Sequence, residues 1–177
     1  MEARGLPEHY TVHDVAEWEG DWELFEGFPI NMAPAPGGAH SLSSVALITQ
    51  LSNALAANDG CRCHVVNEME WHISDSTKWR PDIAIVCDAD PPLSEQPHLT
   101  EAPALIIEIL SMSTRRRDLG TKLHSYEAEG VDWYLTVDPQ DCTMVVRRNG
   151  PGGYEEIAEE AIELHPGCRI PVPKPRR

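Results

Sequence analysis

Two short apolar runs, each interrupted by a single carboxylate, constrain the fold of this chain more than any other feature. They span residues 81–87 and 104–110, and each has the length and composition of a strand that is buried on both faces. Asp82 lies in the first run and Glu108 in the second. An ionised carboxylate inside a protein is costly unless a cation, a metal ion or a hydrogen-bond donor offsets its charge, so both acids require partners.

The places of the two acids in their strands predict a common site. Asp82 opens its strand directly after Pro81, and Glu108 lies in the second half of its own strand. If the strands pair, the carboxylates converge and form a site for a hard cation, because Mg²⁺ (or Mn²⁺) prefers carboxylate oxygens. The alternative is that each carboxylate only caps the end of a strand in solvent.

The remaining patterns predict a mixed α/β fold of the α+β type. Leu42, Val45, Leu51 and Leu55 recur at helical spacing after a Pro/Gly-rich loop over 33–38. The order strand, helix, strand in the second half of the chain predicts a crossover between parallel strands. The expected elements are a helix over 12–18, a hairpin over 22–32 that turns at Glu26-Gly27 and places Pro29 at a sheet edge, a helix over 39–58, strands over 62–73, 81–87, 104–110 and 133–139, a helix over 118–130, and a hairpin over 143–157.

Length and composition fit one domain. The chain has 177 residues, of which 41% are hydrophobic and 24% charged, and this balance excludes a disordered or fibrous chain. We expect a single domain over 1–170, followed by a flexible Pro-rich, basic tail over 171–177. No run approaches the roughly eighteen apolar residues of a membrane helix, and the first residues lack the pattern of a leader, so the expected location is the cytoplasm.

The net charge of −15 argues against a simple nucleic-acid binder, because such proteins are usually basic. The acids are unevenly placed, however, with eight in residues 1–26 and five glutamates in residues 155–163. The glutamates indicate a solvated face or, alternatively, a mimic of nucleic acid. The middle of the chain is its basic part and holds six of the fourteen cations: Lys78, Arg80, Arg115, Arg116, Arg117 and Lys122.

The cysteines do not predict a disulfide framework. Their number is odd, the chain is long enough to fold without covalent links, and no C-x-x-C pair occurs. Cys61 and Cys63 would share one face of a strand, with His64 on the other face, and zinc binding there is the less favoured alternative. The five cysteines are Cys61, Cys63, Cys87, Cys142 and Cys168.

A loop rich in hydroxyl groups and cations joins Glu108 to the next helix. Ser111, Ser113 and Arg115 lie in this loop, which suits a phosphate better than an apolar ligand. In the helix, Lys122 follows Asp118 by four residues, so both lie on one face. Such a pair is ordinarily a solvated stabiliser worth ~0.2–0.5 kcal/mol, but the preceding loop favours a functional role.

Several short motifs follow one another in a fixed order along the chain. They are Trp22-Glu23-Leu24-Phe25-Glu26-Gly27, His40, Arg80-Pro81-Asp82-Ile83, Ile107-Glu108-Ile109-Leu110-Ser111-Met112-Ser113-Thr114, Asp118, Lys122, Tyr126 and Gly130-Val131-Asp132-Trp133-Tyr134. This order resembles the Uma-two family of restriction-endonuclease-like proteins, within the PD-(D/E)XK nuclease-like superfamily. The resemblance covers roughly residues 10–147, and its specificity comes from the order, since Pro-Asp alone is common.

The resemblance implies a restriction-endonuclease-like sheet core flanked by helices and a metal-dependent nuclease site. It assigns Asp82 and Glu108 as metal ligands, with the main-chain carbonyl of Ile109 as a further ligand. Leu110 stands where the superfamily motif has its lysine, and the resemblance implies that Lys122 replaces it. A third acidic position corresponds to Glu26, which would support Lys122 or a second ion.

His40, which corresponds to a frequent histidine of the family, is either a phosphate contact or a structural hydrogen-bonding group. The leading hypothesis is a Mg²⁺-dependent DNA endonuclease, with Ser111, Ser113 and Arg115 as further phosphate contacts. A homodimer is expected because cutting both strands needs two sites. The alternatives are a catalytically inactive domain of this fold that binds a partner, for which the charge argues, and hydrolysis of RNA or another phosphodiester.

Overall fold

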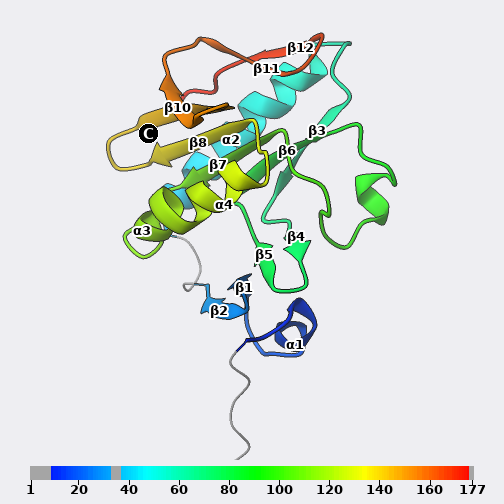
Figure 1. Ribbon diagram of the computed structural model, residues 1–177. Helices are drawn as coiled ribbons and strands as arrows, with labels where there is room; N and C mark the ends of the chain where they lie inside the picture. Colours follow the sequence, from blue (N-terminus) through cyan, green and yellow to red (C-terminus); the bar gives the residue numbers. More distant parts are fainter. Residues whose placement is uncertain (1–8, 33–36, 176–177) are drawn as a thin grey trace, which may run out of the picture.

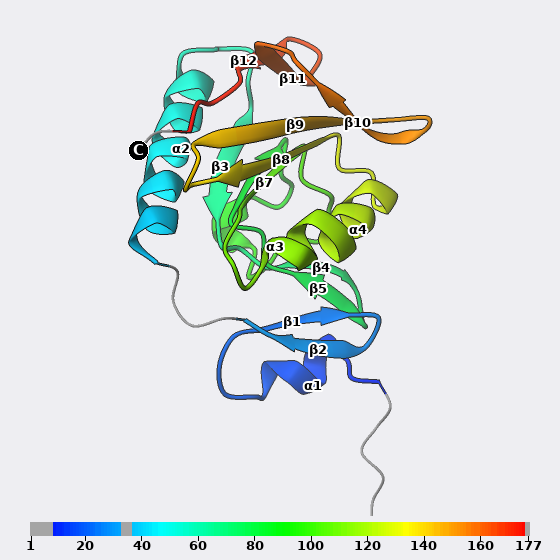
Figure 2. The same cartoon turned by 90° about the vertical axis from the view of Figure 1, so that its left-hand side faces the viewer.

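The computed structural model describes residues 9–32 and 37–175. A six-stranded mixed sheet forms the centre (Figure 1), with helix α2 on one face and helices α3 and α4 on the other (Figure 2). The predicted α+β class with an N-terminal hairpin is confirmed. The helices are α1 (Val12–Ala16), α2 (Gly38–Ala56), η1 (Leu93–Glu95), α3 (Arg115–Arg117), η2 (Asp118–Lys122) and α4 (Leu123–Ala128). The strands are β1 (Trp22–Phe25), β2 (Phe28–Asn31), β3 (Cys63–Asn67), β4 (Trp71–Ser74), β5 (Thr77–Trp79), β6 (Ile83–Cys87), β7 (Leu105–Ile109), β8 (Trp133–Asp138), β9 (Thr143–Gly150), β10 (Gly153–Ile157), β11 (Ala161–His165) and β12 (Cys168–Pro171).

The central sheet brings the two acid-bearing strands together. Its strand order is β10-β9-β8-β7-β6-β3, and β7 pairs antiparallel with β6 and parallel with β8, which confirms the predicted crossover. The β6–β7 register aligns Ile83 with Ile107. One step further along this antiparallel register lies the pair Asp82 and Glu108, so the pairing itself places the two carboxylates next to each other.

Alternation along β7 divides the interior into two hydrophobic clusters. Leu105, Ile107 and Ile109 pack in the cluster that contains the buried leucines of α2. Ile106 points the other way and packs with Tyr126 of α4. Because side chains alternate between the faces of a strand, Glu108 shares the face of Ile106 and points toward α4. The candidate site therefore lies on the side of the sheet that α3, η2 and α4 cover.

Helix α2 has the predicted extent to within two residues at each end, but its apolar face is different. Leu51 and Leu55 are buried as expected, together with Leu47. Leu42 and Val45, which were assigned to the same face, are 69% and 65% exposed. The error arose because nearly every turn of this helix carries an apolar residue, so the periodicity fitted more than one face.

The N-terminal hairpin turns where the sequence indicated. Glu26 and Gly27 both have positive φ angles, 48° and 81°, which is the requirement of a two-residue hairpin turn. β2, which contains Pro29, is an edge strand, as predicted, in a second sheet of order β2-β1-β5-β4. β1 pairs antiparallel with β5, with Leu24 opposite Lys78. This pairing joins the N-terminal hairpin to the β4–β5 hairpin in the second sheet.

The predicted single strand over 62–73 is wrong. It is two strands in different sheets, because Glu68 between them adopts a positive φ of 50°. The Glu68 carbonyl accepts a hydrogen bond from the Arg80 side chain at 3.0 Å, and its N–H donates to the Asp82 carbonyl at 3.2 Å. These contacts hold the chain at the point where it leaves the central sheet.

The predicted helix over 118–130 begins earlier and is not a uniform α-helix. α3 starts at Arg115, and a π-helical turn over Asp118–Lys122 separates it from α4. Such turns are frequent at functional sites. Asp118 and Lys122, at the two ends of this turn, are 1% and 2% exposed. The alternative of a solvated ion pair is therefore wrong for these residues.

Four of the five cysteines form disulfide bonds, contrary to the sequence prediction. Cys61 is joined to Cys168 and Cys63 to Cys87, whereas Cys142 is free. The prediction failed because tertiary pairing sets the partner of each cysteine. The pairing of β3 with β6 aligns Cys63 with Cys87. Cys168 lies in β12, which pairs with β11 to form the C-terminal hairpin.

The expected flexible tail is docked up to Lys174. Gln50 of α2 exchanges two hydrogen bonds with the backbone of Lys174, at 2.9 and 3.0 Å, and the Val172 N–H donates to the Glu160 carbonyl. Residues 176–177 of the predicted tail and residues 33–36 of the predicted loop lie outside the described residues. Among the helices that the structure describes, none has the length and apolarity needed to cross a membrane.

Candidate active site

Asp82 is the most accessible acid of the site. It directly precedes β6, and its side chain is 21% exposed. Its Oδ2 accepts a 2.7 Å hydrogen bond from the Ile109 N–H of β7. This bond orients the carboxylate across the two paired strands, toward the position of Glu108.

Glu108 projects from β7 into the space between the sheet and α4 and is 2% exposed. Its Oε1 accepts hydrogen bonds from Lys122 Nζ at 2.9 Å and from the Tyr126 hydroxyl at 2.8 Å. Its Oε2 is 3.4 Å from the Asp82 N–H. Burial raises the pKa of Glu108 well above its usual value, against the opposing effect of Lys122, and the nearby Asp82 raises it further.

Lys122 bridges two buried carboxylates. Its Nζ lies 2.7 Å from Glu23 Oε1 and 2.9 Å from Glu108 Oε1, and it also lies 5.7 Å from the centre of the Trp79 ring. Burial by itself would lower the pKa of Lys122, but the charges of Glu108 and Glu23 raise it well above its usual value. The lysine is therefore held as a cation.

Glu23 of β1 is the second buried carboxylate that contacts Lys122. It is fully buried, accepts a hydrogen bond from the Arg80 N–H at 3.2 Å, and its Oε2 lies 3.3 Å from Arg117 Nε. Asp118 is also buried, and burial is the main reason that its pKa is raised. Among the described residues, Glu23 Oε2 and Asp118 Oδ1 are buried without a hydrogen-bond partner.

The site has more carboxylates than cations. Four carboxyl groups, Asp82, Glu108, Glu23 and Asp118, lie around two permanent cations, Lys122 and Arg117. If all four acids are ionised, the excess is two negative charges. An excess of this sign in a poorly solvated region attracts a divalent cation.

His40 in the first turn of α2 closes the site on the solvent side. Its Nε2 lies 3.2 Å from Asp82 Oδ2, and the two residues line a cavity of about 150 Å³ together with Ser41, Ser44 and Glu68. The hydrogen bond to Asp82 raises the pKa of His40, although burial opposes the shift. This cavity is the opening through which a ligand would reach Asp82.

We expect Asp82→Asn to lower the pKa of His40 in the metal-free protein. Because the folded-state pKa is raised above about 6.5, the contact stabilises the fold below that pH, and this stability is lost as the pH rises through the folded-state value. NMR titration of the His40 ring signals, assigned with His40→Gln, measures the shift. An unchanged pKa in Asp82→Asn would show that the 3.2 Å contact does not exist in solution.

The predicted phosphate-contact loop forms a hydroxyl cluster at the edge of the site. Ser111 Oγ lies 3.0 Å from both Ser113 Oγ and Thr114 Oγ1, and the Thr114 N–H also donates to it. Arg115 is half exposed and forms an ion pair with Asp138. The loop thus joins Glu108 to η2 as expected, while Arg115 is partly neutralised by an acid of β8.

A comparison with known protein families shows which family the chain belongs to. A profile of the Uma2 (Uma-two) family, described as a putative restriction endonuclease, matches residues 7–169. The chain belongs to the Uma2 family. The resemblance predicted from the motifs is therefore confirmed. No curated protein matches the sequence significantly.

A solved structure supports the same fold for this Uma2 protein. The crystal structure of a putative nuclease of the DUF820 family from Anabaena variabilis superposes with a TM-score of 0.71 at 19% sequence identity. The match covers 89% of this chain and 90% of the other. The predicted nuclease-like sheet core with flanking helices is thus confirmed.

The structure places Glu23, and not Glu26, beside Lys122 in this Uma2 chain. Glu26 lies in the exposed turn between β1 and β2, where its N–H and carbonyl bond to Thr77 and His9. Both glutamates belong to the same motif. Glu23 is directly followed by Leu24 within a short apolar run, and a carboxylate in such a run is the sequence signal of a buried acid. The signal that identified Asp82 and Glu108 would have selected it.

Tyr126 is the other residue whose role was missed. It is one of the family motifs but was given no role, and its hydroxyl donates to Glu108. Its position four residues after Lys122 on the same helix was the available signal. The structure brings four of the other predicted residues into one cluster: Asp82, Glu108, Lys122 and His40.

Proposed function

We propose that this protein is a cytoplasmic Mg²⁺-dependent endonuclease that hydrolyses phosphodiester bonds of DNA. The observation that carries the proposal is the meeting of Asp82 and Glu108 on neighbouring strands, with the Lys122 ammonium 2.9 Å from Glu108. Membership of the Uma2 family supports a nuclease. The same geometry supports the metal and the roles of the residues, and the family supports a nucleic-acid substrate.

The donor set suits Mg²⁺ or Mn²⁺. Asp82 and Glu108 would hold the ion through carboxylate oxygens, and the Ile109 carbonyl is a further oxygen donor on the same strand as Glu108. With all four acids ionised, the two excess negative charges around Lys122 favour a divalent cation over a monovalent one. Bound there, Mg²⁺ would supply an acidified water and would neutralise charge on the phosphate.

Lys122 acts as a cation and not as a general base. Its raised pKa keeps it protonated, and two of its three N–H groups point to Glu23 and Glu108. Within residues 9–32 and 37–175 the amine has no third hydrogen-bond partner, so its third N–H can donate to the attacking water or to a phosphate oxygen whose charge grows as the water oxygen bonds to phosphorus and the ester oxygen leaves. Glu23 and Tyr126 position this amine and Glu108.

The DNA backbone would approach over the solvent side of Asp82. His40 lines that opening, and Ser111, Ser113 and Arg115 lie on the loop that follows Glu108. These groups would contact the phosphates next to the scissile one. Cutting both strands requires two such sites, so we propose a homodimer as the species that linearises DNA.

The test is cleavage of supercoiled plasmid by the purified protein. With Mg²⁺ or Mn²⁺ we expect nicked and then linear DNA, and no cleavage in the presence of EDTA. Failure to cleave single- or double-stranded DNA with either metal would reject the endonuclease and favour the alternative, a binding domain of the same fold, for which the net charge of −15 is the argument. Cleavage of RNA alone would replace the substrate and keep the site.

A further inference from the structure

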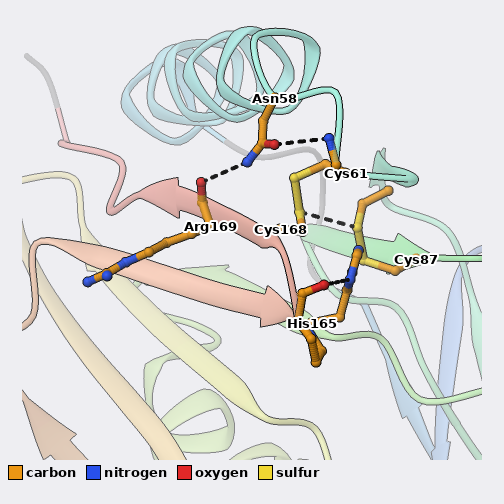
Figure 3. Close-up of a disulfide and its surroundings, with 9 residues drawn as sticks. Asn58, Cys61, Cys87, His165, Cys168 and Arg169 are labelled. Atoms are coloured by element: carbon orange, nitrogen blue, oxygen red, sulfur yellow. Dashed lines mark hydrogen bonds between the residues drawn. A yellow bond between two sulfur atoms is a disulfide. The ribbon is translucent and has the colours of Figure 1, made fainter.

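A compact cluster of sulfur atoms lies at the other end of the molecule from the N-terminal hairpin, where the C-terminal hairpin meets the central sheet. Cys61 follows α2, Cys87 ends β6 and Cys168 begins β12 (Figure 3). Cys63, the partner of Cys87, lies in β3. The buried Cys63 and Cys168 belong to the hydrophobic cluster that α2 covers, whereas Glu108 faces α4. The cluster is therefore separate from the candidate active site.

The distances within the cluster fit a metal ion. Cys63 Sγ and Cys168 Sγ are not bonded to each other but lie 3.8 Å apart. Zinc binds thiolate sulfur at about 2.3 Å in a tetrahedron, and two sulfurs on such a tetrahedron are roughly 3.8 Å apart. In the oxidised chain this is the contact distance of two packed disulfides, and it equals the separation that two sulfur ligands of one zinc ion require.

His165 supplies a nitrogen donor at the same place. One of its ring nitrogens lies within 4.8 Å of Cys63 Sγ and Cys168 Sγ, which themselves meet the same limit. The hydrogen bonding of the ring shows which nitrogen is available as a donor to a metal. Nδ1 lies 3.1 Å from the Pro166 carbonyl oxygen, which can only accept a hydrogen bond, so Nδ1 carries the proton. The Nε2 lone pair is buried and has no hydrogen-bond partner among the described residues.

This arrangement of His165 is typical of a metal ligand. Ligating histidines usually donate their second ring N–H to a carbonyl or carboxylate, which fixes the ring and leaves the other nitrogen for the metal. A buried nitrogen lone pair with no donor is otherwise a cost to folding. A zinc ion in the cluster would satisfy it.

We propose that the reduced protein binds one Zn²⁺ through Cys63, Cys168 and His165, with a fourth ligand from Cys61 or Cys87. Reduction of each disulfide takes two electrons and two protons from a dithiol, which leaves as a cyclic disulfide. The thiols that bind zinc then release their protons to solvent, since the thiolate is the ligand. The resulting site of three sulfurs and one nitrogen is a known structural zinc type.

Such a site would join the C-terminal hairpin to the sheet. A cavity of about 360 Å³ lined by Cys61, Cys63 and His64 borders the cluster and gives a metal ion access to it. The soft sulfur donors select zinc over Mg²⁺, so the two proposed metal sites differ in chemistry as well as in place.

The test uses the full chain, reduced with a dithiol under nitrogen, freed of dithiol and titrated with Co²⁺ and with Zn²⁺. We expect about one Co²⁺ per chain with the near-ultraviolet charge-transfer absorption of thiolate ligands, and displacement of Co²⁺ by Zn²⁺. Cys142→Ser, the matched control at the free cysteine, and Asp82→Asn at the other site should retain the absorption. A reduced wild-type chain without this absorption would overturn the proposal, whatever happens to the variants.

The ligand set is tested by single substitutions. Cys63→Ser, Cys168→Ser and His165→Gln are each expected to weaken Zn²⁺ binding at least tenfold, as measured by competition with a chromophoric chelator, while far-ultraviolet circular dichroism reports the fold. His165→Gln with unchanged Zn²⁺ affinity, or absorption that requires Cys142, would contradict the proposed set.

Discussion

Replacing Lys122 with methionine is expected to lower the free energy of unfolding by about 3–5 kcal/mol, because removal of one partner leaves buried charges unpaired. Glu23 and Glu108, its two partners, are both nearly inaccessible to solvent. Methionine keeps most of the volume and the contact with Trp79, so the loss reports the charge. Urea unfolding of the wild type and the variant measures the difference.

The pH dependence and a control make this prediction specific. The folded-state pKa of Glu108 is raised, and loss of Lys122 raises it further, so the penalty is smallest below the folded-state pKa of Glu108 in the wild type and grows as the pH rises through that value. Lys174→Met, at an exposed lysine, should change stability by less than about 0.5 kcal/mol. Equal stability of Lys122→Met and wild type at pH 8 would contradict the buried charge network.

Asp82→Asn is expected to reduce Mg²⁺-dependent DNA cleavage at least ~100-fold with little change in stability. Asparagine can still accept the hydrogen bond from the Ile109 N–H, and the position is partly exposed, so the fold should persist. The substitution removes the charge that we assign to metal binding. Initial rates of plasmid cleavage at several Mg²⁺ concentrations measure the effect.

Asp88→Asn is the matched control for this substitution. Asp88 follows the same strand, β6, but pairs with Arg62 at the surface and lies outside the candidate site. Its positive φ of 52° is one that asparagine tolerates. We expect this variant to cleave as the wild type does. Full activity in Asp82→Asn, or equal losses in both variants, would remove Asp82 from the catalytic site.

The sequence predicted the central strands because their signal is local. A continuous apolar run such as 104–110 is buried whichever strands lie beside it, and a turn such as Glu26-Gly27 needs only its own backbone angles. The division of 62–73 could not be predicted in this way. The positive φ of Glu68 is supported by Arg80 and Asp82, which are distant in sequence.

Part of the candidate site could be predicted because a carboxylate that interrupts an apolar strand can be recognised in the sequence. Asp82 and Glu108 interrupt apolar runs, and the family resemblance added Lys122. Glu23 was missed because the resemblance pointed to Glu26, three residues later, although Glu23 interrupts a short apolar run as Asp82 and Glu108 do. The cysteine pairs were missed because the tertiary fold brings together cysteines that are 24 and 107 positions apart in the sequence.

A crystal structure of the protein soaked with Mn²⁺, with the ion located by its anomalous scattering, would show whether the two acids share one metal ion. We expect one site in contact with carboxylate oxygens of both Asp82 and Glu108, with Lys122 Nζ beside Glu108. An ion bound elsewhere, or none at a Mn²⁺ concentration that supports cleavage, would contradict this expectation.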